Sequence, residues 1–167
     1  MGPTPACVGA TPRALAEGIP DGAFWPITGD IKSVAAAWRK QNRQEREDLQ
    51  NGQGRLFDPD SLQPWDRLGN LASELGQLLA MPDQDADDVR TKEEMYAELV
   101  RSAAWENSQL WADAWCAAFV WEKSERWDYG LTERRFRELE RGPHQVASWL
   151  RDEIGRLADQ YRFFHWH

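Results

Sequence analysis

The chain has 167 residues, a formal net charge of −8 and two cysteines, which fits one domain of ordinary size without a disulfide framework. The negative charge excludes a dominant basic surface of the kind that drives non-specific DNA binding. The sequence has no run of about 18 apolar residues and no signal peptide in residues 1–12, so we expect a cytoplasmic protein with no membrane contact.

Residues 1–28 contain five prolines and several glycines, which predict an extended N-terminal arm without regular structure. Phe24, Trp25 and Ile27 are expected to pin the end of this arm to the core. Residues 29–167 are predicted to form a single helical domain.

The first helix of that domain is expected to follow Gly29, with Asp30 as its N-cap, and to end near residues 51–52. Its first half has an apolar stripe, whereas its second half is polar on nearly every side. The basic residues of the polar half form either a solvated face with intermixed glutamates or an interface with a partner. These residues are Arg39, Lys40, Arg43 and Arg46.

Two amphipathic helices are predicted next. The first covers residues 64–81, and its buried face consists of Leu68, Leu71, Leu75, Leu78 and Leu79. The second begins within the acidic residues 83–88, which suit the positive end of a helix dipole. It carries Val89, Tyr96, Leu99 and Val100 on one side.

Residues 108–122, SQLWADAWCAAFVWE, are apolar all round apart from Asp113, and predict a central, buried helix. A buried carboxylate must be paired, hydrogen-bonded or protonated, so we interpret Asp113 as a structural residue, with general acid or base chemistry as the alternative. A short charged helix over residues 131–141, capped by Thr132, and a last amphipathic helix after the break at residues 142–143 complete the prediction. The predicted fold is therefore all-α, with five to six helices around a central apolar helix.

Three groups of segments resemble a known family. They are GIPDGAFWPITGDIKSVAAAWRKQNRQER with GRLFD, VRTKEEMYAEL with LWADAWCAAFVWEK, and the closing YRFFHWH. Together they resemble the helical region of the large adenine-specific DNA methyltransferases of restriction–modification and phage-defence systems, of the BREX, DISARM and type IIG-like kind. The resemblance covers roughly residues 18–167.

In that family the S-adenosylmethionine loop and the Asn-Pro-Pro-aromatic motif lie outside the helical region, and this sequence contains no Pro-Pro pair. The resemblance implies a non-catalytic accessory or scaffold module without a cofactor or metal: an excised domain, a split-gene subunit or a remnant. Its expected partner is a methyltransferase catalytic domain or another defence-system protein, with DNA bound only as part of a complex. Self-association is expected when the partner is missing. The C-terminal residues expected to face that partner, beside the basic half of the first helix, are Phe163, Phe164, His165 and Trp166.

Two other functions stay open. Asp21, Asp30 and Lys32 match the bare pattern of a metal-dependent nuclease, which would need residues 30–32 to form a strand. Alternatively, the chain is a helical protein–protein adaptor unrelated to DNA. Three tryptophans in or beside loops are candidates for nucleotide stacking, namely Trp25, Trp65 and Trp127.

Overall fold

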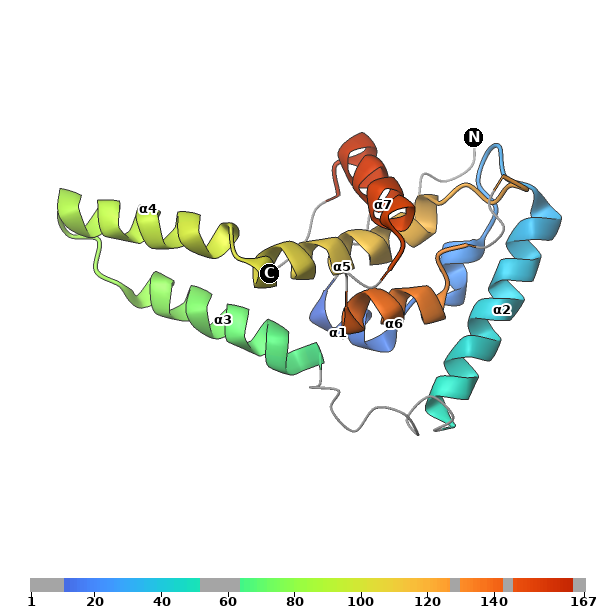
Figure 1. The fold of residues 1–167 in the computed structure, drawn as a ribbon, viewed down its shortest axis with the longest axis horizontal. Helices are drawn as coiled ribbons and strands as arrows, with labels where there is room; N and C mark the ends of the chain where they lie inside the picture. Colours follow the sequence, from blue (N-terminus) through green and yellow to red (C-terminus); the bar gives the residue numbers. More distant parts are fainter. Residues whose placement is uncertain (1–10, 52–63, 127–129, 143–145, 164–167) are drawn as a thin grey trace. The chain divides into compact units, whose positions relative to one another are not determined.

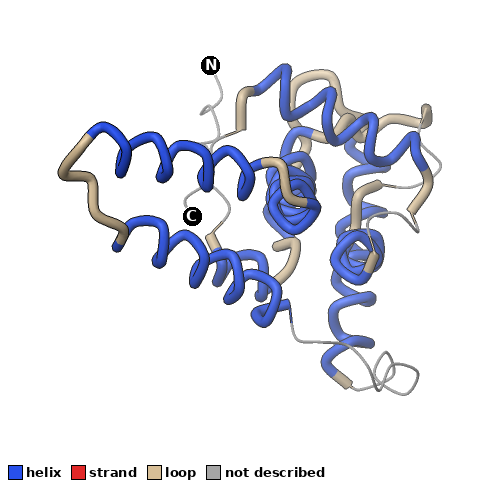
Figure 2. The backbone as a smooth tube through the Cα atoms, turned by 60° about the vertical axis from the view of Figure 1, so that its left-hand side comes forward, coloured by secondary structure: helices blue, strands red, loops and turns tan. Residues whose placement is uncertain are grey.

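A computed structural model describes residues 11–51, 64–126, 130–142 and 146–163 of the chain. Within these ranges the protein consists of α-helices and one 3-10 helix, without a strand, which confirms the all-α prediction (Figures 1 and 2). None of the described helices is both long and apolar enough to cross a membrane. Several predicted site residues lie outside the described residues, namely Trp127, Phe164, His165, Trp166 and the side chain of Trp65.

The elements follow one another as α1 (Pro12–Glu17), η1 (Asp21–Phe24), α2 (Lys32–Gln50), α3 (Pro64–Ala80), α4 (Ala86–Val100), α5 (Ala103–Val120), α6 (Glu133–Arg141) and α7 (Ser148–Tyr161). They form two compact units. Unit 1 comprises Met1–Pro59 and Leu110–His167, and unit 2 comprises Asp60–Gln109, so that the boundary falls within α5.

Part of the predicted N-terminal arm is helical, so the prediction of an irregular arm over residues 1–28 was wrong for α1 and η1. The Thr11 side chain accepts a hydrogen bond from the Ala14 amide, and a proline in the first turn suits a helix start. The prolines thus delimit short helices instead of preventing them. Phe24 is buried as predicted, but Trp25 and Ile27 are 66% and 36% exposed, so the prediction that they pin the chain to the core was wrong.

Helix α2 buries one face along its length, at Ala35, Trp38, Asn42 and Glu45. The polar second half therefore does not simply project into solvent, because two of its side chains are buried inside unit 1. At the apolar end of this face, a Cβ added at Gly130 would overlap the ring of Trp38. Glycine at that position lets the chain before α6 approach α2 closely.

Helix α5 is buried on every side from Trp111 to Ala118, including Asp113, which lies within the apolar helix predicted over residues 108–122. The Trp111 ring stacks on Phe136 of α6 with ring centroids 5.3 Å apart. The buried position of Trp111 and Trp115 indicates packing residues and not nucleotide-stacking ones.

Unit 2 contains α3 and α4, which lie side by side as an antiparallel hairpin (Figures 1 and 2). Leu71 and Leu78 are buried as predicted. Leu79 of α3 is 67% exposed, and the α4 residues Val89 and Tyr96 are exposed as well, so the predicted burial of Leu79 was wrong. Two helices cover only the faces that they turn toward one another, and the flanks of each apolar stripe stay open.

Candidate functional site

Unit 1 holds a group of polar side chains, together with the backbone of Ile19, where α2, the chain after α1 and the start of α6 meet. We call the residues Ile19, Asn42, Glu45, Glu133 and Arg137 the polar junction. Asn42 has no exposed surface, and Glu45 and Glu133 are buried as well. Because a buried polar group is costly unless it is hydrogen-bonded, the contacts of these side chains decide whether the fold tolerates them.

Two side chains of α2 cap the N-terminus of α6. The Oδ1 atom of Asn42 accepts a hydrogen bond from the Glu133 amide at 2.8 Å, and Oε2 of Glu45 accepts one from the Arg134 amide at 2.9 Å. The first amides of a helix have no partner within the helix, so these bonds satisfy two of them. Thr132 occupies the N-cap position, but its side chain makes no capping bond, so the predicted local cap was wrong.

The same asparagine also fixes the chain that follows α1. Its Nδ2 atom donates to the carbonyl oxygen of Ile19 at 2.9 Å. The amide of Ile19 in turn donates to Oε2 of Glu133 at 2.7 Å. Both backbone groups of Ile19 are thereby satisfied, one by α2 and one by α6.

The Glu133 carboxylate also binds Arg137, whose Nε lies 2.7 Å from Oε1. Arg137 donates further to the carbonyl oxygen of Ala16 at 2.9 Å and to Glu140 at 2.8 Å. Burial acts to lower the pKa of Arg137, but the carboxylates of Glu133 and Glu140 outweigh it and raise that pKa above its ordinary value. The Arg137 guanidinium therefore stays charged over any ordinary pH range.

Gly18 lies directly against this ion pair. Its φ of +82° belongs to the region that favours glycine, and a Cβ placed there would overlap the carboxylate of Glu133. Its carbonyl oxygen accepts a hydrogen bond from the Trp115 indole at 3.0 Å, so α5 also holds this turn.

A second buried ion pair ties the start of α2 to the chain after α5. The Lys123 Nζ lies 3.4 Å from Oδ2 of Asp30, and the side chains are 0% and 2% exposed. Oδ1 and Oδ2 of Asp30 accept from the amides of Lys123 at 3.0 Å and Ile27 at 2.9 Å. Burial lowers the pKa of Lys123 from its ordinary value, and the attraction of Asp30 opposes this only in part. Asp30 therefore does not act as the predicted N-cap, because its carboxylate is occupied in this turn, and α2 begins at Lys32.

The three residues of the nuclease pattern are not brought together as that pattern requires. Asp21 binds Arg43 on α2, with Oδ2 3.0 Å from Nε, whereas Asp30 binds Lys123. Lys32 is exposed, and residues 30–32 lead into a helix where the nuclease would need a strand. Within the described residues, no group of three histidines, cysteines or carboxylates is arranged to hold a metal ion.

The basic residues predicted for a partner interface fall into two groups. Arg39 and Lys40 are exposed on α2, whereas Arg43 binds Asp21, and Nη2 of Arg46 donates to the carbonyl oxygen of Glu17 at 3.4 Å. The second group thus holds the N-terminal segment on α2. At the other end of the chain, Phe163 is half-buried and stacks on Tyr161 with ring centroids 6.2 Å apart.

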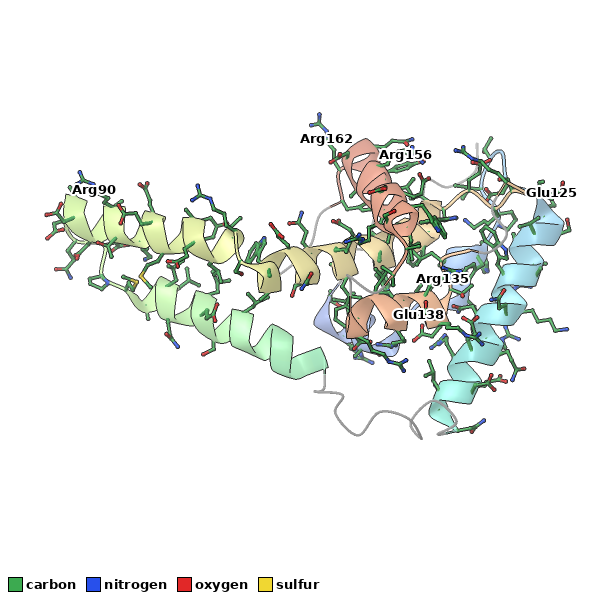
Figure 3. All side chains as sticks on the ribbon, in the orientation of Figure 1. Arg90, Glu125, Arg135, Glu138, Arg156 and Arg162 are labelled. Carbon is green, nitrogen blue, oxygen red and sulfur yellow. The ribbon has the colours of Figure 1, made fainter. Side chains whose placement is uncertain are left out.

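Two further arginines, one on α6 and one on α7, are engaged within unit 1. Figure 3 shows Arg135 and Glu138 on α6 and Arg156 on α7. The Arg135 guanidinium lies 5.6 Å from the centre of the Trp149 ring, a cation–π contact between the two helices. Arg156 binds Glu153 one turn away on the same helix.

Sequence reasoning missed the polar junction, although the spacing of its α2 residues carried a signal. Positions 35, 38, 42 and 45 continue one helical stripe, and the last two are polar. A stripe that turns polar without losing its spacing indicates buried polar residues with partners. The partners themselves, 89 and 91 residues away, leave no mark in the local sequence.

Comparisons with protein-family models, with curated proteins and with solved structures gave no match to this chain.

Proposed function

We propose that the chain is a non-catalytic helical scaffold module that binds a partner protein. Following the resemblance of its segments, we infer that the partner is the catalytic part of a DNA-methyltransferase-like defence protein. The module would work in the cytoplasm and would meet DNA only as part of that complex.

The observation that carries this proposal is the exposure of large apolar side chains on ordered elements. Trp25 and Leu79 are each about two-thirds exposed at 66% and 67%, and the others range from 36% to 47%. Such residues usually mark protein interfaces when several occur on one surface. In unit 1 they are Trp25, Ile27, Ile31 and Tyr161, and in unit 2 they are Leu79, Val89, Met95 and Tyr96.

The use of the buried ionisable groups supports the same function. Glu45, Glu133 and Asp30 each accept hydrogen bonds from backbone amides of another segment, and Lys123 is bound to Asp30. These contacts hold the segments of unit 1 together. A firmly held framework with apolar side chains on its outside suits a module that positions another protein.

The proposal is tested by tagging the protein at its own chromosomal locus and purifying it under mild conditions. An adenine methyltransferase polypeptide should copurify in a fixed ratio, and calorimetry should detect no S-adenosylmethionine binding by the isolated chain. Micromolar binding of this cofactor by the isolated chain would contradict the proposal. If no methyltransferase is eluted together with the tagged protein, the proposed choice of partner is wrong.

A further inference from the structure

One surface of unit 1 combines exposed apolar side chains with cations that pair with no carboxylate of the described residues. It lies where the chain runs from η1 into the first half of α2. We call the residues Trp25, Ile27, Ile31, Lys32, Arg39 and Lys40 the Trp25 patch. All six are exposed, Trp25 the most at 66%.

The fold brings the segment that carries Trp25, Ile27 and Ile31 alongside α2, which carries the three cations. Asp21, at the start of η1, is bound to Arg43 in the second half of α2, and the chain then reaches the beginning of α2 at Lys32. The segment 21–31 therefore runs back along the first half of α2, and η1 packs against this helix. On α2 itself, positions 32 and 39 share a face with Arg43, which binds Asp21, and Lys40 lies about 100° further round the helix from Arg39.

The segment is also held in place from the inside. The Ile31 amide donates to the carbonyl oxygen of Lys123 at 2.8 Å, and Asp30 is bound to Lys123 beneath it. Phe24 is buried beside the exposed Trp25. The exposed side chains are therefore presented by an ordered backbone, which lowers the entropy cost of binding.

The charge of the patch differs from that of the whole chain. No acidic residue occurs between Asp30 and Glu45, and the carboxylate of Asp30 is already bound to Lys123. Among the described residues, no carboxylate lies within ion-pair distance of Lys32, Arg39 or Lys40. Glu125, labelled in Figure 3, is exposed on the loop beside the start of α2 and makes no such pair with them. A chain of net charge −8 thus carries three exposed cations on the helix next to a segment with exposed apolar side chains.

We propose that the Trp25 patch is the docking site for an acidic amphipathic segment of the partner protein. Apolar side chains of that segment would cover Trp25, Ile27 and Ile31, and its carboxylates would pair with Lys32, Arg39 and Lys40. This assignment rests on the proposed scaffold function and adds to it the binding surface and the chemistry of the bound segment.

A protein segment fits the patch better than a nucleic acid does. Single-stranded nucleic acids bind to basic grooves lined with several aromatic rings, whereas this patch has one ring and two isoleucines. Exposed isoleucines gain from burial against aliphatic groups, which a protein segment supplies and a phosphate backbone does not.

The test uses the full chain and labelled synthetic peptides. The main probe is a helical peptide of glutamate, leucine and alanine, with leucines on one face. Matched peptides replace either every glutamate by lysine or every leucine by glutamine. Fluorescence anisotropy at about 0.15 M salt should show binding of the acidic amphipathic peptide at least roughly tenfold tighter than that of either matched peptide.

Two variants locate the binding on the molecule. Trp25→Ala and the double variant Arg39→Gln/Lys40→Gln should each weaken peptide binding by roughly tenfold, because each removes one half of the recognition. The control is the double variant Arg90→Gln/Tyr96→Ala, which removes an exposed cation and an exposed aromatic ring from α4 in unit 2 and should bind as tightly as the wild type.

Three outcomes would overturn the proposal: equal binding of all three peptides, equal loss in the α4 control, or tighter binding of a single-stranded oligonucleotide that is lost in the Trp25→Ala variant. The last result would make the patch a nucleic-acid surface. If the patch does not bind the peptide, copurification still tests the scaffold function. If no methyltransferase copurifies, peptide binding can still be measured. The two failures are therefore distinguishable.

Discussion

The N-termini of α4 and α6 are capped differently, one by a neighbouring residue and the other by residues distant in the sequence. At α4, Oδ1 of Asp85 accepts from the amides of Asp87 at 2.9 Å and Asp88 at 2.8 Å, so the cap comes from the residue just before the helix. At α6, Thr132 stands in the corresponding position without a capping bond, and Asn42 and Glu45 of α2 supply the acceptors.

The α4 cap therefore stabilises only its own helix end, whereas the α6 cap also holds the tertiary structure together. The α4 cap is exposed and serves only its own helix, so its loss affects one helix end. The α6 cap is buried, and its asparagine also binds the carbonyl oxygen of Ile19. Removing the Asn42 side chain leaves polar backbone groups of two separate segments without partners inside the protein. An unsatisfied polar group lowers stability most when it is buried.

The largest effect is expected from Glu133→Ala. The change leaves the Ile19 amide without its acceptor and removes one of the two carboxylates that bind the partly buried Arg137. We expect a loss of about 3–5 kcal/mol in the free energy of unfolding, measured by urea denaturation. A loss below about 1 kcal/mol would show that the junction does not hold the N-terminal segment.

Asn42→Ala should follow, with a loss of about 2–3 kcal/mol, because the Glu133 amide and the Ile19 carbonyl lose their partners together. Gln44→Ala is the matched control, since Gln44 is exposed on the same helix and, among the described residues, bonds to Asp48 one turn away. Equal losses of unfolding free energy in the two variants would show that the buried amide of Asn42 contributes no more to stability than the exposed amide of Gln44.

Asp85→Ala tests the local side of the comparison. A loss of about 1 kcal/mol is the usual effect of removing an aspartate cap from an exposed helix. Because the bonds stay within residues 85–88, the change should lower the helical signal of circular dichroism slightly without exposing the core. An effect as large as that of Asn42→Ala would mean that both helix starts contribute alike.

The smallest effect concerns Lys123, whose ammonium donates to the carbonyl oxygen of Trp121 beyond the end of α5. Its pKa is lowered by burial, so between that pKa and 10.5 the unfolded chain holds a proton that the folded chain has released. The free energy of unfolding should therefore rise with pH in this window, by less than about 1.4 kcal/mol per pH unit.

The measurement is the difference in unfolding free energy between the wild type and Lys123→Met, taken from pH 7 to 10, so that other titrations cancel. This difference should increase toward alkaline pH. A constant difference would mean that Lys123 keeps its proton in both states over this range.

The sequence predicted helices where periodicity and caps are local, and failed where partners are distant. The apolar run around Asp113 and the leucine stripe of α3 follow from spacing alone. Trp25 was misassigned because an aromatic residue next to a buried Phe24 gives no sign of which of the two faces inward. Asp30 looked like a cap because its competing partner, Lys123, is 93 residues away.

The candidate surface was predicted only in part. Arg39 and Lys40 were expected to face a partner and are exposed, yet Arg43 and Arg46 hold the N-terminal segment on α2. A basic residue on a helix shows its charge in the sequence, but not whether a carboxylate or a carbonyl from another segment neutralises it.

The long reach of the Ile19 contacts has a consequence for biosynthesis. Its amide is bound by a residue 114 positions later in the chain, so this bond cannot form until Glu133 has left the ribosome. Until then Ile19, which is buried in the finished fold, has no acceptor from α6 for its amide. The segment around Ile19 is thus completed only after α6 has been synthesised, and chaperone binding to this segment during translation should end only then.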